Sequence, residues 1–244
     1  AADERADIQL LGVQEELLKS VHATGTPVVL VLLNGSAIAV NWADENVAAI
    51  LEAWYPGEEG GTAIADVLFG DYNPAGRLPV TFYKSLDQLP PFEDYRMENR
   101  TYRYFKGEPL YPFGYGLSYT TFTYSDLRIT PATIKAGQGT SLQVTVENTG
   151  SMAGDEVVQL YLTDLEASVP VPIRSLQGFK RIHLAPGERQ TVSFTLRPYQ
   201  MAVVDYQGQR IVEPGNFLVA VGGGMPTGDS QAKGQVVTGI FSVV

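Results

Sequence analysis

The sequence has 244 residues, of which 44% are hydrophobic and 18% are charged, and its formal net charge is −10. This length suits one large domain or two ordinary ones, and the apolar content excludes wholesale disorder. No apolar run approaches the ~18–20 residues of a membrane-spanning helix. No basic stripe is present that would bind phosphates. We therefore expect neither a membrane nor a nucleic acid as a partner.

Cysteine is absent, and histidine occurs only at His22 and His183. The lack of cysteine excludes disulfides, thiolate metal sites and cysteine nucleophiles. Neither histidine has a ligand-like neighbour, so the sequence predicts no metal site and no cofactor. The chain begins at Ala1 with neither an initiator methionine nor a signal peptide, and we interpret it as a fragment or a processed piece.

Charge is distributed unevenly along the chain. Residues 1–125 contain seventeen acids and eight bases, whereas residues 126–244 contain ten acids and nine bases. The change coincides with a change of hydrophobic pattern, which indicates two domains. We place them at 1–122 and 123–244.

The first domain alternates predicted helices and strands. Helical spacing of apolar residues predicts helices over 10–21 and 58–69, with Gly25 and Gly70 as their terminators. Continuous apolar runs predict buried strands over 27–33 and 48–54, and a further strand over 77–83. This order predicts a partial α/β sandwich, a parallel-type sheet with helices, whose remaining strands lie upstream.

The second domain shows period-two alternation in about seven short runs, separated by turns such as Ala185-Pro-Gly187 and Glu213-Pro-Gly215. This pattern is typical of an antiparallel β-sandwich, and without a cysteine pair it favours the fibronectin type III-like kind. Between the domains, residues 85–121 are rich in proline and aromatic residues. We expect an ordered, aromatic-rich excursion of the first domain.

Several runs are specific enough to indicate a family. They read AWYPGEEGGTAIADVLFGDYNPAGRLPVTF at 53–82, RTYRYF at 100–105, PLYPFGYGLSYTTF at 109–122, GERQTV at 187–192 and GNFLVAVG at 215–222. Their order and content resemble the C-terminal portion of glycoside hydrolase family 3, across essentially the whole chain.

The resemblance implies a retaining, exo-acting β-glucosidase or β-xylosidase. It implies a TIM-like barrel that carries the Asp nucleophile, then an α/β sandwich that carries the acid/base Glu, then a fibronectin-like domain. Both catalytic carboxylates would lie upstream, so we expect no catalytic residue in this chain. Glu4-Arg5 resembles an Asp-Arg pair of the family, and we assign Glu4 no catalytic role.

Two acidic positions are candidates for a catalytic pair. Glu58 and Glu59 are adjacent, whereas a retaining enzyme needs two carboxyls about 5–5.5 Å apart across the sugar. Acids at a helix start favour the positive end of the helix dipole, so we interpret them as capping residues.

The excursion holds the candidates for contact with substrate. Aromatic rings stack on sugars and Arg–Asp pairs bind hydroxyls. The alternative, which we favour, is an internal ion-pair and aromatic cluster that pins the excursion. If a loop of this chain reaches the entrance of the active site, we expect it to be this one. Its substrate-entrance candidates are Asp94, Tyr95 and Arg100, beside Phe92, Arg96 and Arg103.

Two functions stay open on the sequence alone. The chain is either the C-terminal portion of a β-glycosidase or a non-catalytic carbohydrate-binding or scaffold fragment. As part of a β-glycosidase, the chain has the upstream barrel portion as its protein partner and an oligosaccharide or aryl β-glycoside as its substrate. The sequence leaves open whether it also forms a homodimer. The sugar is not indicated, and we favour a secreted or periplasmic location over a cytoplasmic one.

Overall fold

The structure is a computed structural model that describes residues 7–244, apart from the side chain of Asp229. The resemblance noted at Glu4 lies outside the described residues. The chain forms two compact units. The first contains residues up to 72, 80–101 and 105–112, and the second contains 73–79, 102–104 and 113–244. The first strand of the sandwich, β3, begins at Phe122, and no β-sheet of the described residues combines strands from 7–121 with strands from 122–244. The boundary near residue 122 stays a prediction about separable domains.

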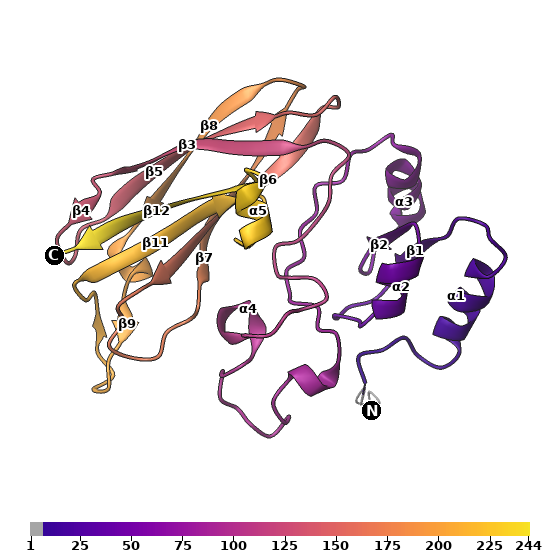
Figure 1. Cartoon of the computed structure of the whole chain (residues 1–244), viewed down its shortest axis with the longest axis horizontal. Helices are drawn as coiled ribbons and strands as arrows, with labels where there is room; N and C mark the ends of the chain where they lie inside the picture. Colours follow the sequence, from indigo (N-terminus) through magenta and orange to yellow (C-terminus); the bar gives the residue numbers. More distant parts are fainter. Residues whose placement is uncertain (1–6) are drawn as a thin grey trace. The chain divides into compact units, whose positions relative to one another are not determined.

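The first unit is the predicted partial α/β layer. Its two strands are parallel, with Val29 beside Ala49 and Leu32 beside Glu52. Leu18, Leu32 and Val40 form its core. In chain order its elements are α1 (Gln14–His22), β1 (Val29–Leu32), α2 (Asn41–Asn46), β2 (Ala49–Glu52), α3 (Gly60–Phe69) and η1 (Leu86–Gln88), followed by α4 (Thr101–Tyr104), which the two units share (Figure 1).

Two sequence-based strand expectations were wrong. Residues 77–83 form no strand, and Phe82 makes one isolated antiparallel bridge with Tyr111. Pro79 interrupts the run because it has no N–H to donate to a ladder. Trp54 follows β2 instead of lying within it, and its φ of +53° turns the chain there.

Helix ends were predicted with partial success. Gly25 and Gly70 have φ of +81° and +85°, as expected of glycines that end helices. Glu59 occupies the N-cap position of α3, but its carboxylate accepts a hydrogen bond from the Thr62 hydroxyl at 3.1 Å and caps no backbone N–H. The capping role expected of Glu59 was therefore wrong in its detail.

The second unit contains the predicted antiparallel sandwich. One sheet has the strand order β4-β12-β11-β6-β7 and the other β3-β5-β8. The pairs are antiparallel except β4 with β12. The strands are β3 (Phe122–Thr130), β4 (Thr133–Ile134), β5 (Thr140–Asn148), β6 (Gly154–Asp164), β7 (Ser175–Leu184), β8 (Arg189–Leu196), β9 (Val203–Val204), β10 (Arg210–Ile211), β11 (Gly215–Gly222) and β12 (Val236–Val243), with η2 (Pro198–Gln200) and α5 (Gly228–Ala232) between them.

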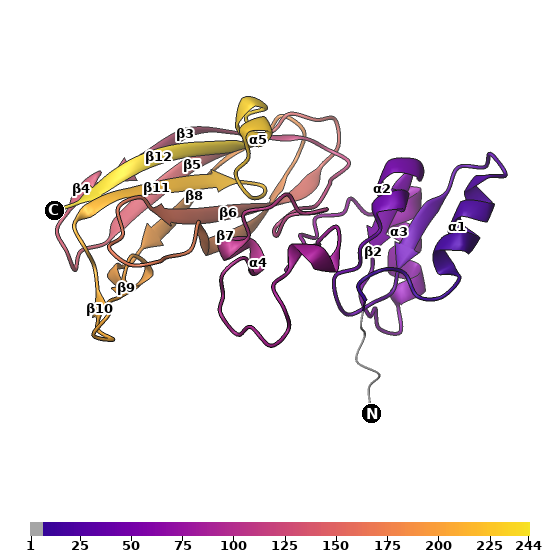
Figure 2. The ribbon, with the colours of Figure 1, turned by 60° about the horizontal axis from the view of Figure 1, so that its bottom comes forward.

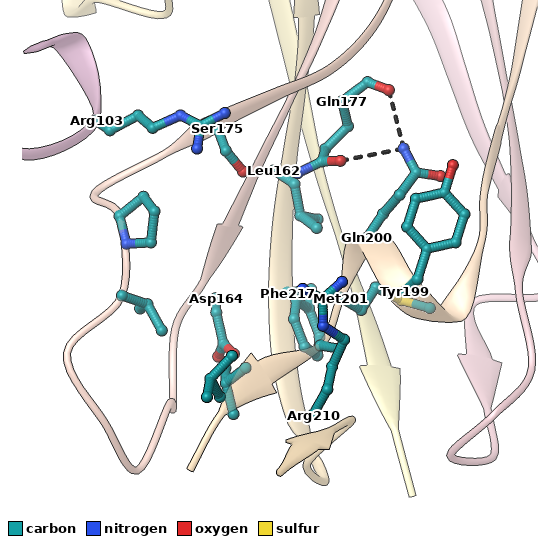
Figure 3. A pocket seen from close by; sticks show the side chains of 15 residues that line it. Arg103, Leu162, Asp164, Ser175, Gln177, Tyr199, Gln200, Met201, Arg210 and Phe217 are labelled. Atoms are coloured by element: carbon teal, nitrogen blue, oxygen red, sulfur yellow. Dashed lines mark hydrogen bonds between the residues drawn. The ribbon is translucent and has the colours of Figure 1, made fainter. Parts of the chain in front are cut away.

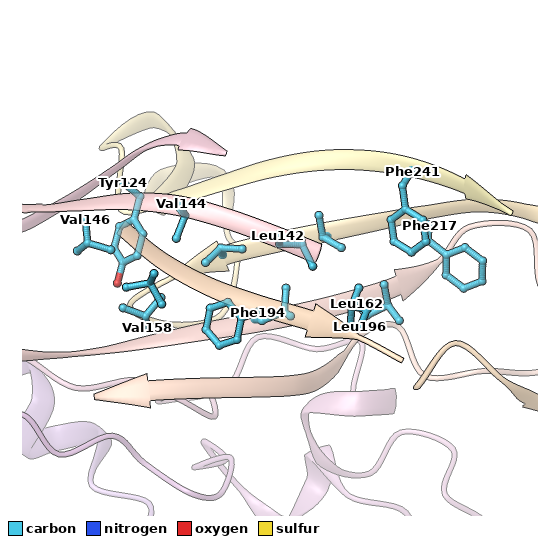
Figure 4. Close-up of a cluster of buried hydrophobic side chains, with 14 of the residues drawn as sticks. Tyr124, Leu142, Val144, Val146, Val158, Leu162, Phe194, Leu196, Phe217 and Phe241 are labelled. Carbon is cyan, nitrogen blue, oxygen red and sulfur yellow. The ribbon is translucent and has the colours of Figure 1, made fainter. Parts of the chain in front are cut away.

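The core of the sandwich lies between the two sheets. Figure 4 shows side chains such as Leu142 and Phe194 from one sheet against Val158, Leu162 and Phe217 from the other. Alternation produces this core, because every second residue of β5 is buried. Each fully buried aliphatic or aromatic side chain stabilises such a core by roughly 1.5–3 kcal/mol.

Candidate functional site

The loop of residues 89–100, which precedes α4, holds the candidates chosen from the sequence (Figure 2). Asp94 and Arg96 form an ion pair within it. The Arg96 Nη2 lies 2.7 Å from Asp94 Oδ2, and the Arg96 Nε lies 3.0 Å from Oδ1. The backbone N–H of Arg96 also donates to Asp94 Oδ1 at 3.0 Å. These bonds occupy the carboxylate in a tight local turn.

The charge of Asp94 is stabilised by that pairing. Hydrogen bonds from the Arg96 guanidinium, and then from the Arg96 backbone, lower the pKa of Asp94 to about 2. Asp94 is therefore a carboxylate across the physiological range. A general acid needs a raised pKa, so this group is suited to accepting hydrogen bonds and unsuited to donating a proton.

Arg100 stabilises the same loop from inside. Its Nη2 donates to the carbonyl oxygens of Pro91 at 2.8 Å and Asp94 at 2.6 Å. In contrast, Tyr95 is 89% exposed and Phe92 is 82% exposed. The loop thus combines a polar interior with two aromatic rings that face solvent, which is the kind of surface on which sugars stack.

The base of the loop is fixed by a second set of contacts. The Tyr83 hydroxyl accepts a hydrogen bond from the backbone N–H of Thr101 at 2.9 Å. The Asn99 side-chain amide donates to the carbonyl oxygen of Gln88 at 3.1 Å. Asn99 and Thr101 have positive φ, of 56° and 54°, which costs of order 1–3 kcal/mol at each residue. Strain of this size persists only where neighbouring contacts hold the backbone.

Arg103 was grouped with these residues on the sequence, but it belongs to the other compact unit. Its carbonyl oxygen accepts the N–H of Ile173 at 2.7 Å. The adjacent Tyr102 ring stacks on Phe113 at 4.1 Å. The structure therefore brings together Asp94, Tyr95, Arg96 and Arg100, whereas Arg103 contributes to a different part of the fold.

A buried network in the second unit was missed by the sequence analysis. Arg77 Nη2 lies 2.8 Å from Glu156 Oε2, and the Tyr124 hydroxyl donates to Glu156 Oε1 at 2.6 Å. The Arg77 Nε also donates to the carbonyl oxygen of Gly223 at 3.0 Å. Arg77 lies in the GRLP stretch of the longest motif, and Glu156 is a charged residue in an apolar strand. The sequence signal that could have revealed the network is the charged Glu156 within the largely apolar run of β6.

A histidine–carboxylate pair lies on the edge strand β7. His183 Nδ1 and Arg181 Nε both contact Asp155, each at 2.6 Å. Burial alone would raise the pKa of Asp155, but the hydrogen bonds from His183 and Arg181 outweigh it and leave this pKa below its usual range. The side chains of Arg181 and His183 are both more than half exposed. The Asp155 carboxylate on β6 thus joins two side chains of the neighbouring strand β7, which is a structural contact.

The described residues offer no metal centre, because no group of three or more potential ligands gathers among them. Within the same part of the chain, no helix is long and apolar enough to cross a bilayer.

The class of architecture is a short α/β layer followed by a fibronectin-like sandwich. Residues 1–119 match the glycosyl hydrolase family 3 C-terminal domain, and residues 156–224 match the fibronectin type III-like domain. The chain belongs to glycosyl hydrolase family 3, as its motifs indicated.

Curated relatives and solved structures agree with this family. The chain is 44% identical to a β-xylosidase of Formosa agariphila over 90% of its length and 31% of the relative's. It is likewise 44% identical to a periplasmic β-glucosidase of Salmonella typhimurium, over 91% of the chain and 30% of the relative. It superposes on a β-glucosidase of Erythrobacter marinus with a TM-score of 0.84 and 38% identity, covering 98% of this chain and 31% of that one.

The chain thus spans about a third of the length of these relatives. In them, the matching part is joined to a much longer stretch of polypeptide.

Proposed function

We propose that the chain is the C-terminal portion of a retaining, exo-acting β-glycosidase that hydrolyses terminal β-linked sugars of oligosaccharides. The observation that carries the proposal is the match across 90% or more of the chain to proteins named β-xylosidase and β-glucosidase. The nucleophile and the acid/base belong, in this proposal, to the remaining part of the enzyme.

The chemistry of the described carboxyls supports that division. Retention needs one ionised nucleophile and one carboxyl that can donate a proton. Asp94 is paired with Arg96 and strongly acidic, and Glu156 is buried against Arg77. Burial raises the pKa of Glu52, but its Oε1 is occupied by the backbone N–H of Trp54 at 3.1 Å. Each of these groups has a local structural partner.

The substrate class follows from the relatives. Their names divide between β-xylosidase and β-glucosidase, so aryl β-xylosides, aryl β-glucosides and the corresponding oligosaccharides are the substrates to assay. The periplasmic relative supports a secreted or periplasmic location.

The loop 89–100 is proposed as part of the substrate entrance. Tyr95 would stack on a sugar ring outside the reacting bond, while Asp94 and Arg100 hold the loop in shape. Such a role predicts weaker substrate binding with little change in the chemical step. In the whole enzyme, Tyr95→Ala, Asp94→Asn and Arg100→Ala should each raise KM severalfold and leave kcat within about twofold. Tyr206→Ala, which removes an equally exposed ring in the sandwich unit, is the control.

The test of the main proposal compares this chain alone with the chain joined to a barrel-containing upstream portion. We expect hydrolysis of an aryl β-xyloside or β-glucoside only by the joined protein, with retention of anomeric configuration. If the joined, folded protein binds oligosaccharides but hydrolyses neither glycoside, the chain is part of a carbohydrate-binding or scaffold protein instead.

A further inference from the structure

A cavity of about 260 Å³ lies within the second unit, at the end of β6 beside the β9–β10 hairpin. Figure 3 shows that its wall combines Asp164 from β6, Gln177 from β7, Tyr199 and Gln200 from η2, and Arg210 from β10. Its remaining lining includes apolar side chains such as Phe217. Pockets for drug-sized ligands measure roughly 300–1,000 Å³, so this one suits a smaller ligand.

The amide wall of the cavity is rigid. The Gln200 side-chain amide donates to the Gln177 carbonyl oxygen at 2.9 Å and to Gln177 Oε1 at 3.1 Å. The Gln177 amide donates onward to the Ser175 hydroxyl at 2.7 Å, and Gln200 Oε1 accepts the N–H of Arg197 at 2.9 Å. Polar groups held in this way are already oriented for a ligand, which lowers the entropic cost of binding.

Asp164 supplies the carboxylate of the cavity. The N–H of Glu166 donates to its Oδ1 at 3.0 Å, and the backbone N–H of Ala167 also hydrogen-bonds to this carboxylate. Asp164 forms no ion pair within the described part of the chain. Burial, and then the nearby carboxylates of Glu213 and Glu166, raise its pKa. A half-buried carboxyl without a cation is costly, and hydroxyl donors from a ligand would relieve that cost.

The mixture of charges selects the ligand. The Asp164 carboxylate would repel a free anion such as phosphate, and the guanidinium groups of Arg103 and Arg210 would repel a metal cation. A neutral polyhydroxylated molecule can use both, donating hydroxyls to Asp164 and accepting from arginine. The Tyr199 ring is 60% exposed at the rim and can stack on the C–H face of a sugar.

We propose that this cavity is an accessory carbohydrate-binding site, which holds one neutral sugar residue of an oligosaccharide in the fibronectin-like unit. The inference is independent of the proposed hydrolysis, because binding is measured on a chain that we expect to lack both catalytic carboxylates. If this chain binds no sugar, the proposed hydrolysis by the whole enzyme is unaffected, and if the whole enzyme hydrolyses no glycoside, sugar binding by this chain can still be measured.

The experiment titrates the 244-residue chain with xylobiose and with cellobiose, using amide NMR shifts and calorimetry. We expect saturable binding and shifts confined to the residues that line the cavity and their neighbours, at 103, 162–164, 171–177, 199–204, 210 and 217. Asp164→Asn should weaken binding about tenfold and Tyr199→Ala about fivefold, since each removes one directed contact. Tyr206→Ala, which removes a ring that is 81% exposed and does not line the cavity, should bind as the parent does.

Other outcomes would overturn the proposal. These are no saturable binding of either disaccharide, shifts elsewhere, equal affinity in Asp164→Asn, Tyr199→Ala and the parent, or stronger binding of alanine, a small zwitterion, than of the disaccharides. Because shift mapping uses the unchanged chain, the proposal stays testable even if a variant fails to fold.

Discussion

At the scale of single residues, Arg77 shows what one residue of the longest motif does in the fold. Its guanidinium group makes hydrogen bonds to Gly223, Ala75, Gly76 and Glu156, all within the second unit. The motif was recognised in the sequence, but the partner was not, because Glu156 lies 79 positions away. Long-range pairs of this kind follow from the register of the sandwich, which periodicity alone does not specify.

The buried pair predicts a large stability effect. Arg77→Ala leaves the Glu156 carboxylate buried without its cation, and breaking such a pair costs about 3–5 kcal/mol. Arg189→Ala removes the exposed partner of Glu147, which should cost at most about 1 kcal/mol. Urea unfolding of the parent and the two variants measures both losses in the free energy of unfolding. Equal losses from the two substitutions would show that burial of the pair is unimportant.

The Asp94–Arg96 pair predicts a pH dependence. A carboxyl whose pKa is lowered to about 2 favours the folded loop above its ordinary pKa, and this contribution is lost as the pH falls toward 2. Arg96→Gln should return the pKa of Asp94 toward its ordinary value. An NMR titration of the Asp94 side-chain carboxyl measures this pKa. Arg189→Gln should leave it near 2. A pKa that stays near 2 in Arg96→Gln would rule out this cause.

At the scale of elements, the sequence predicted the type of most segments and missed several ends. Alternation identified β5 because one side of that strand faces the sandwich core. It also identified β11, although this strand is buried on both faces from Val219 to Gly222. The strand over 77–83 failed because apolar content there reflects burial of an irregular segment, including Phe82, which is 2% exposed. The loop 89–100 was identified by its composition, whereas its turn depends on bonds from Arg96 and Arg100 that have no periodic signal.

The segment 113–116 docks on the sandwich through a glycine. Gly114 has a φ of +78°, and an added Cβ would lie 2.3 Å from Gln159 Oε1 and 2.6 Å from the Tyr161 hydroxyl. Its carbonyl oxygen accepts a hydrogen bond from the Gln159 amide at 3.0 Å. This polar contact is buried, so displacing it leaves buried groups unpaired.

Gly137 offers a matched control. Its φ is +85°, but nothing lies within 4 Å of an added Cβ. Gly137→Ala should therefore lower the free energy of unfolding only by the backbone strain, about 1–2 kcal/mol. Gly114→Ala should lower it by about 2 kcal/mol more. Thermal or urea unfolding measures the difference. Equal costs would mean that the Gln159 contact does not hold the segment.

At the scale of the whole molecule, the two units differ in how fully they bury their apolar side chains. In the first unit, each strand of the two-stranded sheet has one neighbour, and Leu17, Leu33 and Phe69 are 64%, 61% and 84% exposed. The sandwich instead buries a continuous core. The sequence predicted only that the first domain holds part of a sheet, and these exposed side chains are consistent with that prediction.

The contrast predicts uneven protection in the isolated chain. Backbone amides of β1 and β2 should exchange with solvent faster than those of β5, β6 and β11, because local opening of the first unit exposes little further apolar surface. Hydrogen exchange followed by mass spectrometry measures both sets. Equal protection, together with a single cooperative unfolding transition, would contradict this prediction.

We propose that this chain completes a retaining β-glycosidase without supplying its nucleophile. A retaining enzyme forms a covalent glycosyl–enzyme intermediate, which a slowly hydrolysed 2-fluoro glycoside traps. We would treat the whole enzyme with 2-fluoro β-xyloside and β-glucoside reagents and locate the labelled peptide by mass spectrometry. We expect inactivation, with the label outside the 244 residues of this chain. A label on a carboxyl of this chain would contradict it.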